Sequence, residues 1–231
     1  MHLKIKNLPN DERPYEKFLK YGVSSLSDTE LISVLLKTGT KNVTCIELAR
    51  EVLRDYDNSS KLSNLYNKTF EELKSIPGIG EVKAITLKCV AEISKRLSTS
   101  KYTDDFVFDN PKDIANYYME SLRHLKVEEF IVLFLNNRNR YITSRVMTIG
   151  THDESLVSVK DVFSYALKVE AVNIVLIHNH PSGDVTPSNE DMNVTNNMVS
   201  AGKIIGIDVL DHIIIGDKTY LSFRECDIFP I

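Results

Sequence analysis

Two histidines, a serine and an aspartate stand at a spacing that suits a metal-dependent hydrolase. His178 and His180 are one residue apart, Ser188 follows eight residues after His180, and Asp191 comes three residues later. The largely apolar run 172–177 before them predicts a buried strand. Because residues i and i+2 of a strand point to the same face, we expect both imidazoles to be aimed at one point. Two His and one Asp would leave one of the four tetrahedral positions of a zinc ion open, which is the catalytic arrangement.

The segment after the histidines has to return Asp191 to them. Residues 181–187 are rich in Pro, Ser, Gly and Asp, which favour turns, and Asp191 would then lie in the first turn of a following helix. Ser188 with Asp191 also fits an ordinary helix N-cap followed by an acidic first turn, so Ser188 is a cap, a catalytic residue or both. The alternative for His178 and His180 is a pair of hydrogen-bonded loop histidines.

The same residues carry a resemblance to a known family. The pattern His-x-His-x7-Ser-x2-Asp resembles the fingerprint of JAMM (MPN-type) zinc metallopeptidases at every fixed position. The run His-Asn-His-Pro-Ser-Gly-Asp followed by Pro-Ser-x-x-Asp is similar to the bacterial RadC family, long labelled DNA repair proteins. The resemblance covers nearly the whole chain, and its further stretches are residues 11–14, 26–31, 38–40, 128–135, 150–151 and 210–212.

The resemblance implies a fold and a set of roles for the C-terminal part. It implies an α/β domain of the JAMM/MPN-like (cytidine-deaminase-like) kind, a sheet flanked by helices, with one zinc ion per chain. His178, His180 and Asp191 would hold the metal. A coordinated ligand cannot also act as general base, so a separate carboxylate is needed; the resemblance places it at Glu128, although strand alternation alone leaves Glu129 open.

Three further residues near this motif have less defined expectations. The resemblance gives Ser188 the role of a hydrogen-bond donor to the oxyanion that forms during hydrolysis. His212 is a candidate fourth ligand, but the motif is complete without it, which favours a hydrogen-bonded, half-buried histidine. Asp184 is a candidate partner for a histidine ring N–H, but its neighbours favour a turn residue.

The residue pattern of the N-terminal part predicts helices and suggests a contact with DNA. Residues 13–97 show helical apolar spacing, and residues 76–84 resemble a helix-hairpin-helix motif. Gly78 and Gly80 would allow a tight turn and a close approach of the backbone to a phosphate, with Lys83 adding charge. Such contacts would be non-specific in sequence and salt-dependent. The alternative is a helical hairpin used only for packing, and Glu81 would oppose a phosphate.

The length and charge distribution of the chain limit the domain organisation and the partners that can be expected. Its 231 residues are enough for two small domains, and we place them at 1–100 and 106–231, with a linker at 98–105. Residues 1–100 hold 16 Lys and Arg against 13 Asp and Glu, and the remainder holds 12 against 19, which indicates different partners for the two parts. We expect no membrane segment, no signal peptide, and a cytoplasmic location, with three reduced, buried cysteines.

The secondary structure expected after the linker mixes helices and strands. It comprises helices from Pro111 and at 160–169, strands at 130–135, 141–149, 172–177, 208–215 and 219–221, and a hairpin turn at 137–140.

These patterns predict a zinc metallopeptidase that hydrolyses a peptide or isopeptide bond. The alternative, from a different class, is a DNA-binding accessory protein of repair or recombination whose metal domain does not turn over. A metal-dependent nuclease is less favoured, because a single site of two His and one Asp lacks the carboxylate cluster of two-metal enzymes. The sequence names neither the substrate nor the oligomeric state.

Overall fold

The chain divides into two compact units, Met1–Ser94 and Lys95–Ile231, which are described separately. The structure is a computed structural model that describes residues 9, 11, 13–54, 61–99, 107–108, 110–149 and 157–230. Within those residues, no helix is both long enough and apolar enough to cross a membrane.

The first unit is helical, and side-chain caps begin several of its helices. Its elements are α1 (Pro14–Tyr21), the short 3-10 helix η3 (Val23–Ser25), α2 (Asp28–Leu36), α3 (Cys45–Leu53), α4 (Asn64–Asn67), α5 (Phe70–Ser75) and α6 (Glu81–Thr99). Ser27, Thr44 and Thr69 each cap a helix and form a capping box with the Glu three residues later. A buried cluster of apolar side chains from α2, α3, α5 and α6 then holds the helices together.

A tight turn joins α5 to α6. Gly78 has a φ of +100°, which is the left-handed region that favours glycine, and a Cβ there would overlap Thr40. Ile79 is buried in the core of this unit and anchors the turn. The structure therefore contains the helix, turn and helix that the sequence predicts at this place.

The second unit is built on a mixed five-stranded sheet with the order β2-β1-β3-β4-β5. The strands are β1 (Glu129–Leu135), β2 (Tyr141–Ile149), β3 (Asn173–Asn179), β4 (Asp208–Ile215) and β5 (Tyr220–Ser222). β3 and β4 run parallel, whereas the other neighbouring strands are antiparallel. The C-terminal ends of β3 and β4 therefore lie together, beside the N-terminal end of β1.

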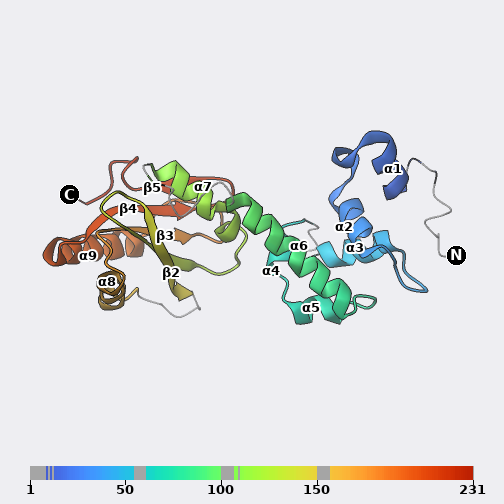
Figure 1. Cartoon of the computed structure of the whole chain (residues 1–231), viewed down its shortest axis with the longest axis horizontal. Coiled ribbons are helices and arrows are strands. Elements are labelled where there is room, and N and C mark those ends of the chain that lie inside the picture. Colours follow the sequence, from blue (N-terminus) through green and yellow to red (C-terminus); the bar gives the residue numbers. More distant parts are fainter. Residues whose placement is uncertain are drawn as a thin grey trace. The chain divides into compact units, whose positions relative to one another are not determined.

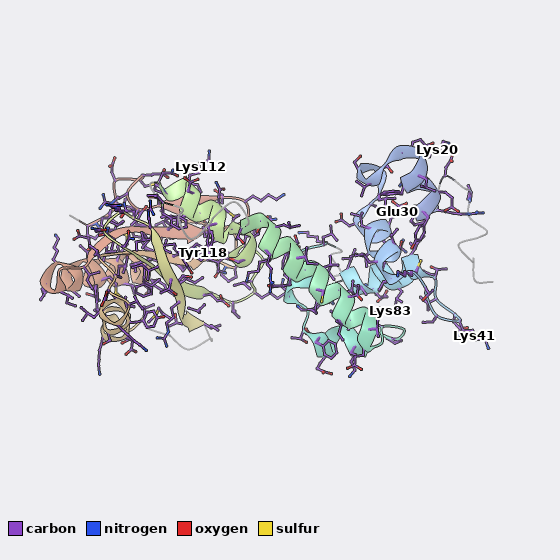
Figure 2. The ribbon with its side chains drawn as sticks, in the orientation of Figure 1. Lys20, Glu30, Lys41, Lys83, Lys112 and Tyr118 are labelled. Atoms are coloured by element: carbon purple, nitrogen blue, oxygen red, sulfur yellow. The ribbon has the colours of Figure 1, made fainter. Side chains whose placement is uncertain are left out.

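Helices cover both faces of this sheet (Figure 1). α8 (Val159–Lys168) and α9 (Asn189–Ile205) pack on one face, where the alternate β3 residues Ile174 and Leu176 point. α7 (Pro111–Leu122) covers the other face; its buried Tyr118, labelled in Figure 2, packs there with Val175 and Ile177. Because each face of β1 and β3 is covered, these strands are apolar along almost their whole length.

A bulge in β4 sets which of its side chains faces α9. Ile174 pairs with Val209 but Val175 pairs with Asp211, so β4 has one extra residue, Leu210, at this point. The extra residue reverses the alternation of the strand beyond it. His212 therefore faces the side of α9, and Asp211 faces the side of α7.

Most of the elements predicted for the second unit are confirmed. The strand over 141–149 and that over 208–215 have the predicted bounds, and the remaining helices and strands differ by a residue or two at their ends. The predicted linker at 98–105 is wrong at its start, because α6 continues through Thr99; residues 100–106 lie outside the described ones, as do Gly150 and Thr151. The domain limits 1–100 and 106–231 therefore stay a prediction.

The prediction of three buried cysteines is also wrong. Cys45 is buried, but Cys89 and Cys226 are exposed. Cys89 lies on the outer side of α6, and Cys226 lies in the turns that follow β5. Spacing within the sequence does not determine which side of a helix a lone cysteine occupies.

We expect Gly202→Ala to destabilise the second unit, because α9 has no room for a side chain at this residue. A Cβ on Gly202 would overlap the carbonyl oxygen of Ile207 and crowd Phe163 at 3.4 Å. Such overpacking costs about 1–3 kcal/mol of unfolding free energy, measurable by urea denaturation. Ser200→Ala, on the exposed side of the same helix, is the control and should change it by less than about 0.5 kcal/mol. Equal stability of the two variants would contradict the close contact.

Candidate metal centre

Three side chains from two elements meet at the C-terminal end of β3. His178 is the penultimate residue of β3, His180 follows the strand, and Asp191 is the third residue of α9. The Nε2 atoms of His178 and His180 are 3.0 Å apart, and Asp191 places Oδ1 3.1 Å from the first and Oδ2 3.5 Å from the second. The prediction that both imidazoles face one point is confirmed by these distances.

Each imidazole is also held from behind through its other ring nitrogen. Nδ1 of His180 lies 2.6 Å from the carbonyl oxygen of Asp184, and Nδ1 of His178 lies 2.8 Å from Nε2 of His212. The ring of His178 stacks on Phe130 of β1 with an interplanar angle of 10°. Both rings are therefore fixed in orientation before any ligand binds, which lowers the entropic cost of assembling a site.

The three groups fit a metal ion in both spacing and chemistry. Among the described residues, His178, His180 and Asp191 form a group of side chains that could hold a metal ion. A tetrahedral ion with bonds of about 2.0–2.1 Å requires its ligand atoms to be about 3.3 Å apart. The Nε2 atoms of the two histidines are 3.0 Å apart, and Asp191 Oδ1 is 3.1 Å from Nε2 of His178. Two imidazole lone pairs and a carboxylate oxygen converging on one point are all stabilised by a cation between them.

The electrostatics of the site favour positive charge at its centre. Burial by itself raises the pKa of the Asp191 carboxyl, but the imidazoles of His178 and His180, 3.1 and 3.5 Å from its oxygens, outweigh it and hold that pKa well below its usual range. The hydrogen bond with Asp191 raises the pKa of the His180 imidazole; burial opposes the rise, while the Asp184 carbonyl and the charges of Asp191 and Glu128 add to it. Asp191 is thus an anion placed to neutralise a cation.

Ser188 and Glu128 lie at the edge of the three ligand candidates. Ser188 is the N-cap of α9: its Oγ accepts from the Asp191 N–H at 3.1 Å and donates to Asp191 Oδ2 at 2.8 Å. Ser188 therefore orients the Asp191 carboxylate. Glu128 is exposed, immediately precedes β1, and is close enough for its charge to raise the pKa of His180. Glu129 is the first residue of β1 and pairs with Ile149 of β2.

A residue that the sequence pattern did not single out fixes the backbone around Glu128. Asn179, between the two histidines, is buried, and its side chain points to the opposite face of β3. Its Oδ1 accepts from the Glu129 N–H at 2.8 Å, and its Nδ2 donates to the Val127 carbonyl at 3.1 Å. One amide thus holds the peptide groups on both sides of Glu128.

His212 is the hydrogen-bonded histidine and Asp184 the turn residue that the sequence favours, and only the burial of His212 differs from the prediction. His212 is fully buried rather than half-buried, and its Nε2 faces the back of His178 rather than the centre. It lies outside the group of possible metal ligands. The Asp184 carboxylate accepts from the backbone and hydroxyl of Thr186, as a turn residue does, and only its backbone carbonyl contacts His180.

The residues proposed for DNA contact lie in the α5–α6 turn of the first unit. Gly80 is exposed, and a Cβ there would meet nothing within 4 Å. Lys83, labelled in Figure 2, donates to the carbonyl of Thr38 at 2.6 Å and to that of Gly78 at 3.2 Å. The Lys83 ammonium thus ties two turns of its own unit together, and this use competes with a phosphate contact.

We expect Asn179→Ala to lower the unfolding free energy by about 1–3 kcal/mol, because it leaves the Glu129 N–H and the Val127 carbonyl without their partner. Urea denaturation measures the change. Asn196→Ala, on the exposed side of α9, serves as the control. An Asn179→Ala protein as stable as this control would show that the two hydrogen bonds contribute nothing.

Comparison with known proteins places the chain in a family. Residues 108–228 match the family model of the RadC-like JAB domain, and residues 5–85 match that of the UPF0758 N-terminal region. The chain is 42% identical to a UPF0758 protein of Clostridium botulinum (strain Okra / Type B1) over 224 residues, 97% of each chain. It is 41% identical to a UPF0758 protein of Halalkalibacterium halodurans over 230 residues, 100% of this chain and 98% of the relative. On both grounds, the chain belongs to the RadC family of UPF0758 proteins and carries a JAB domain in its C-terminal part.

Proposed function

We propose that this protein is a zinc-dependent hydrolase of peptide or isopeptide bonds, with one zinc ion per chain bound by His178, His180 and Asp191. The observation that carries the proposal is the convergence of two imidazole nitrogens and one carboxylate, with one ligand atom of each residue within 4.8 Å of the other two. Three protein ligands leave a fourth position for water or substrate, as in catalytic zinc sites.

The kind of ligand supports zinc, and the fold supports the JAMM type. Imidazole and carboxylate ligands without sulfur suit zinc among the common metals of hydrolases. A mixed sheet with helices on both faces supports placing the second unit among JAMM/MPN-like, cytidine-deaminase-like domains. The proposed domain limits remain 1–100 and 106–231.

The chain's own residues have separate roles in this reaction. When bound, zinc supplies the Lewis acidity that makes water a source of hydroxide near neutral pH. Glu128 takes the proton of the attacking water and returns it to the leaving amine. Its exposed position before β1 and its electrostatic effect on His180 support this choice over Glu129, whose backbone belongs to the β1–β2 ladder.

Ser188 has two roles in the proposal. Its hydroxyl proton is donated to Asp191 Oδ2, which orients the ligand carboxylate. When the substrate carbonyl becomes an oxyanion, the same hydroxyl turns to donate to it instead. His178 and His180 hold the metal and exchange no proton with the substrate.

The division of roles predicts a different outcome for each of three variants. Glu128→Gln should retain about one zinc per chain and lose hydrolysis by 100-fold or more, because general-base catalysis contributes about 10²–10⁴-fold. Glu129→Gln, the matched control, should retain both zinc and hydrolysis. His180→Ala should lose both. Zinc is measured by elemental analysis, and hydrolysis by mass spectrometry of peptide and isopeptide-linked libraries.

Two results would contradict this division. Loss of zinc from Glu128→Gln would make Glu128 a ligand rather than the base. Loss of hydrolysis in Glu129→Gln with activity kept in Glu128→Gln would assign the base to Glu129.

The second candidate function is that of a DNA-binding accessory protein, and one observation favours it. Gly80 has an ordinary φ and its missing Cβ would touch nothing in the protein, so the fold itself does not require a glycine there. A glycine at the start of a 19-residue helix leaves the backbone amides open to a phosphate. The structural use of Lys83 and the charge of Glu81 count against this function.

Gly80→Asp separates this function from stability. Gly80 precedes α6 and its carbonyl accepts from the Ala84 N–H, so it is the N-cap residue, where Asp is favoured over Gly. We expect unchanged or slightly higher stability and, if the turn binds DNA, a several-fold loss of affinity for a fluorescent duplex at low salt. Equal, salt-independent retention of DNA by both proteins would exclude phosphate binding at this turn.

A further inference from the structure

His212 and Thr195 form a buried hydrogen-bonded chain behind the three ligand candidates. Nε2 of His212 lies 2.8 Å from Nδ1 of His178, and Nδ1 of His212 lies 2.6 Å from the hydroxyl of Thr195. The hydroxyl also lies 2.6 Å from the backbone carbonyl of Asp191. Every side chain in this chain is fully or almost fully buried, and Thr195 and His212 each have a relative exposure of 0%.

The acceptor at the end of the chain determines where each proton lies. The Asp191 carbonyl can only accept, so the single hydroxyl proton of Thr195 is donated to it. The Thr195 oxygen then accepts from His212, which places the His212 proton on Nδ1 and leaves its Nε2 as an acceptor. That acceptor requires the proton of His178 to lie on Nδ1. A neutral His178 then carries its lone pair on Nε2, the atom that faces the ligand centre.

We propose that His212 and Thr195 are positioning residues that hold His178 in the metal-binding tautomer and couple it to the helix that carries Asp191. The inference rests on the proposed metal site and adds to it a means by which two of the ligands are held together. The chain starts at the ring of one ligand, His178, and ends on the main chain of another, Asp191. It thus ties β3, β4 and α9 together at the place where their side chains meet.

Packing keeps the ring of His212 in the plane that this chain needs. Phe223 lies against it with ring centroids 4.7 Å apart, and Phe130 contacts it edge-on at 5.5 Å. The bulge at Leu210 turns His212 to this face of β4. Because Thr195 and His212 are fully buried, solvent does not compete for these hydrogen bonds.

The contrast between two substitutions of His212 tests the proposal. His212→Leu removes both hydrogen bonds, whereas His212→Gln keeps one acceptor for His178 and one donor for Thr195. Zinc affinity is measured by competition with a chromophoric chelator. We expect the dissociation constant to rise about 10–100-fold in His212→Leu, as for other partners of ligand histidines, and by less than about 5-fold in His212→Gln.

Thr195 supplies a second pair of variants that changes less of the core. Thr195→Val is nearly isosteric and removes only the hydroxyl, while Thr195→Ser retains it. We expect a several-fold rise in the zinc dissociation constant for Thr195→Val and none for Thr195→Ser. A thermal melting curve will show whether His212→Leu folds. If it does not fold, the Thr195 pair still tests the proposal.

The tautomers can be read without any metal. In the metal-free wild-type protein at about pH 8, long-range proton–nitrogen NMR correlations should place the protons of His178 and His212 on Nδ1. In Thr195→Val, His212 should show a mixture of tautomers.

The outcomes separate this proposal from that of the metal site. Wild-type zinc affinity in His212→Leu and Thr195→Val, or a proton on Nε2 of His178 in the wild type, would overturn the positioning role while leaving the metal site in place. A wild-type protein that binds no zinc but shows both protons on Nδ1 would support the hydrogen-bonded chain and overturn the proposed function instead.

Discussion

The candidate centre depends on one constraint: the ligand groups are each held at the atom that does not face the centre. His180 is held by a loop carbonyl, His178 by the ring of His212, and Asp191 by the cap formed with Ser188. Each of these contacts fixes the orientation of a side chain through its outer atom. The inner atom is left to face the centre. The arrangement therefore needs little reorganisation to accept a cation, and this is what distinguishes it from an accidental cluster of polar side chains.

The sheet makes this arrangement possible by bringing the ends of neighbouring strands together. β3 and β4 run parallel, and His212, two residues before the β4 position that pairs with His178, has its ring centroid 4.8 Å from that of His178. α9 packs across the same face and brings Asp191 and Thr195, one turn apart, to the two histidines. Phe130 packs against the rings of both His178 and His212.

The local parts of this site were predictable from the sequence, whereas its long-range parts were not. Strand alternation is enough to place His178 and His180 on one side, and the cap pattern is enough to place Asp191 in the first helical turn. His212 could not be assigned in this way, because the bulge at Leu210 reverses the alternation of β4 and leaves no signal in the residue types. Asn179 acts on the strand β1, some 50 residues earlier in the chain, and that contact exists only in the folded sheet. For Lys83, charge and spacing suggested a phosphate contact, but the neighbouring turn at Thr38 takes its ammonium.

The most direct test of the metal centre is the zinc K-edge X-ray absorption spectrum of the wild-type protein loaded with one equivalent of zinc. The account predicts scattering from two imidazoles and from oxygen ligands at about 2.0–2.1 Å, with no sulfur. A shell of sulfur at about 2.3 Å would place the metal on cysteine, and failure to retain zinc would leave the histidines without a metal. Either result would contradict the claim that His178, His180 and Asp191 form a metal site.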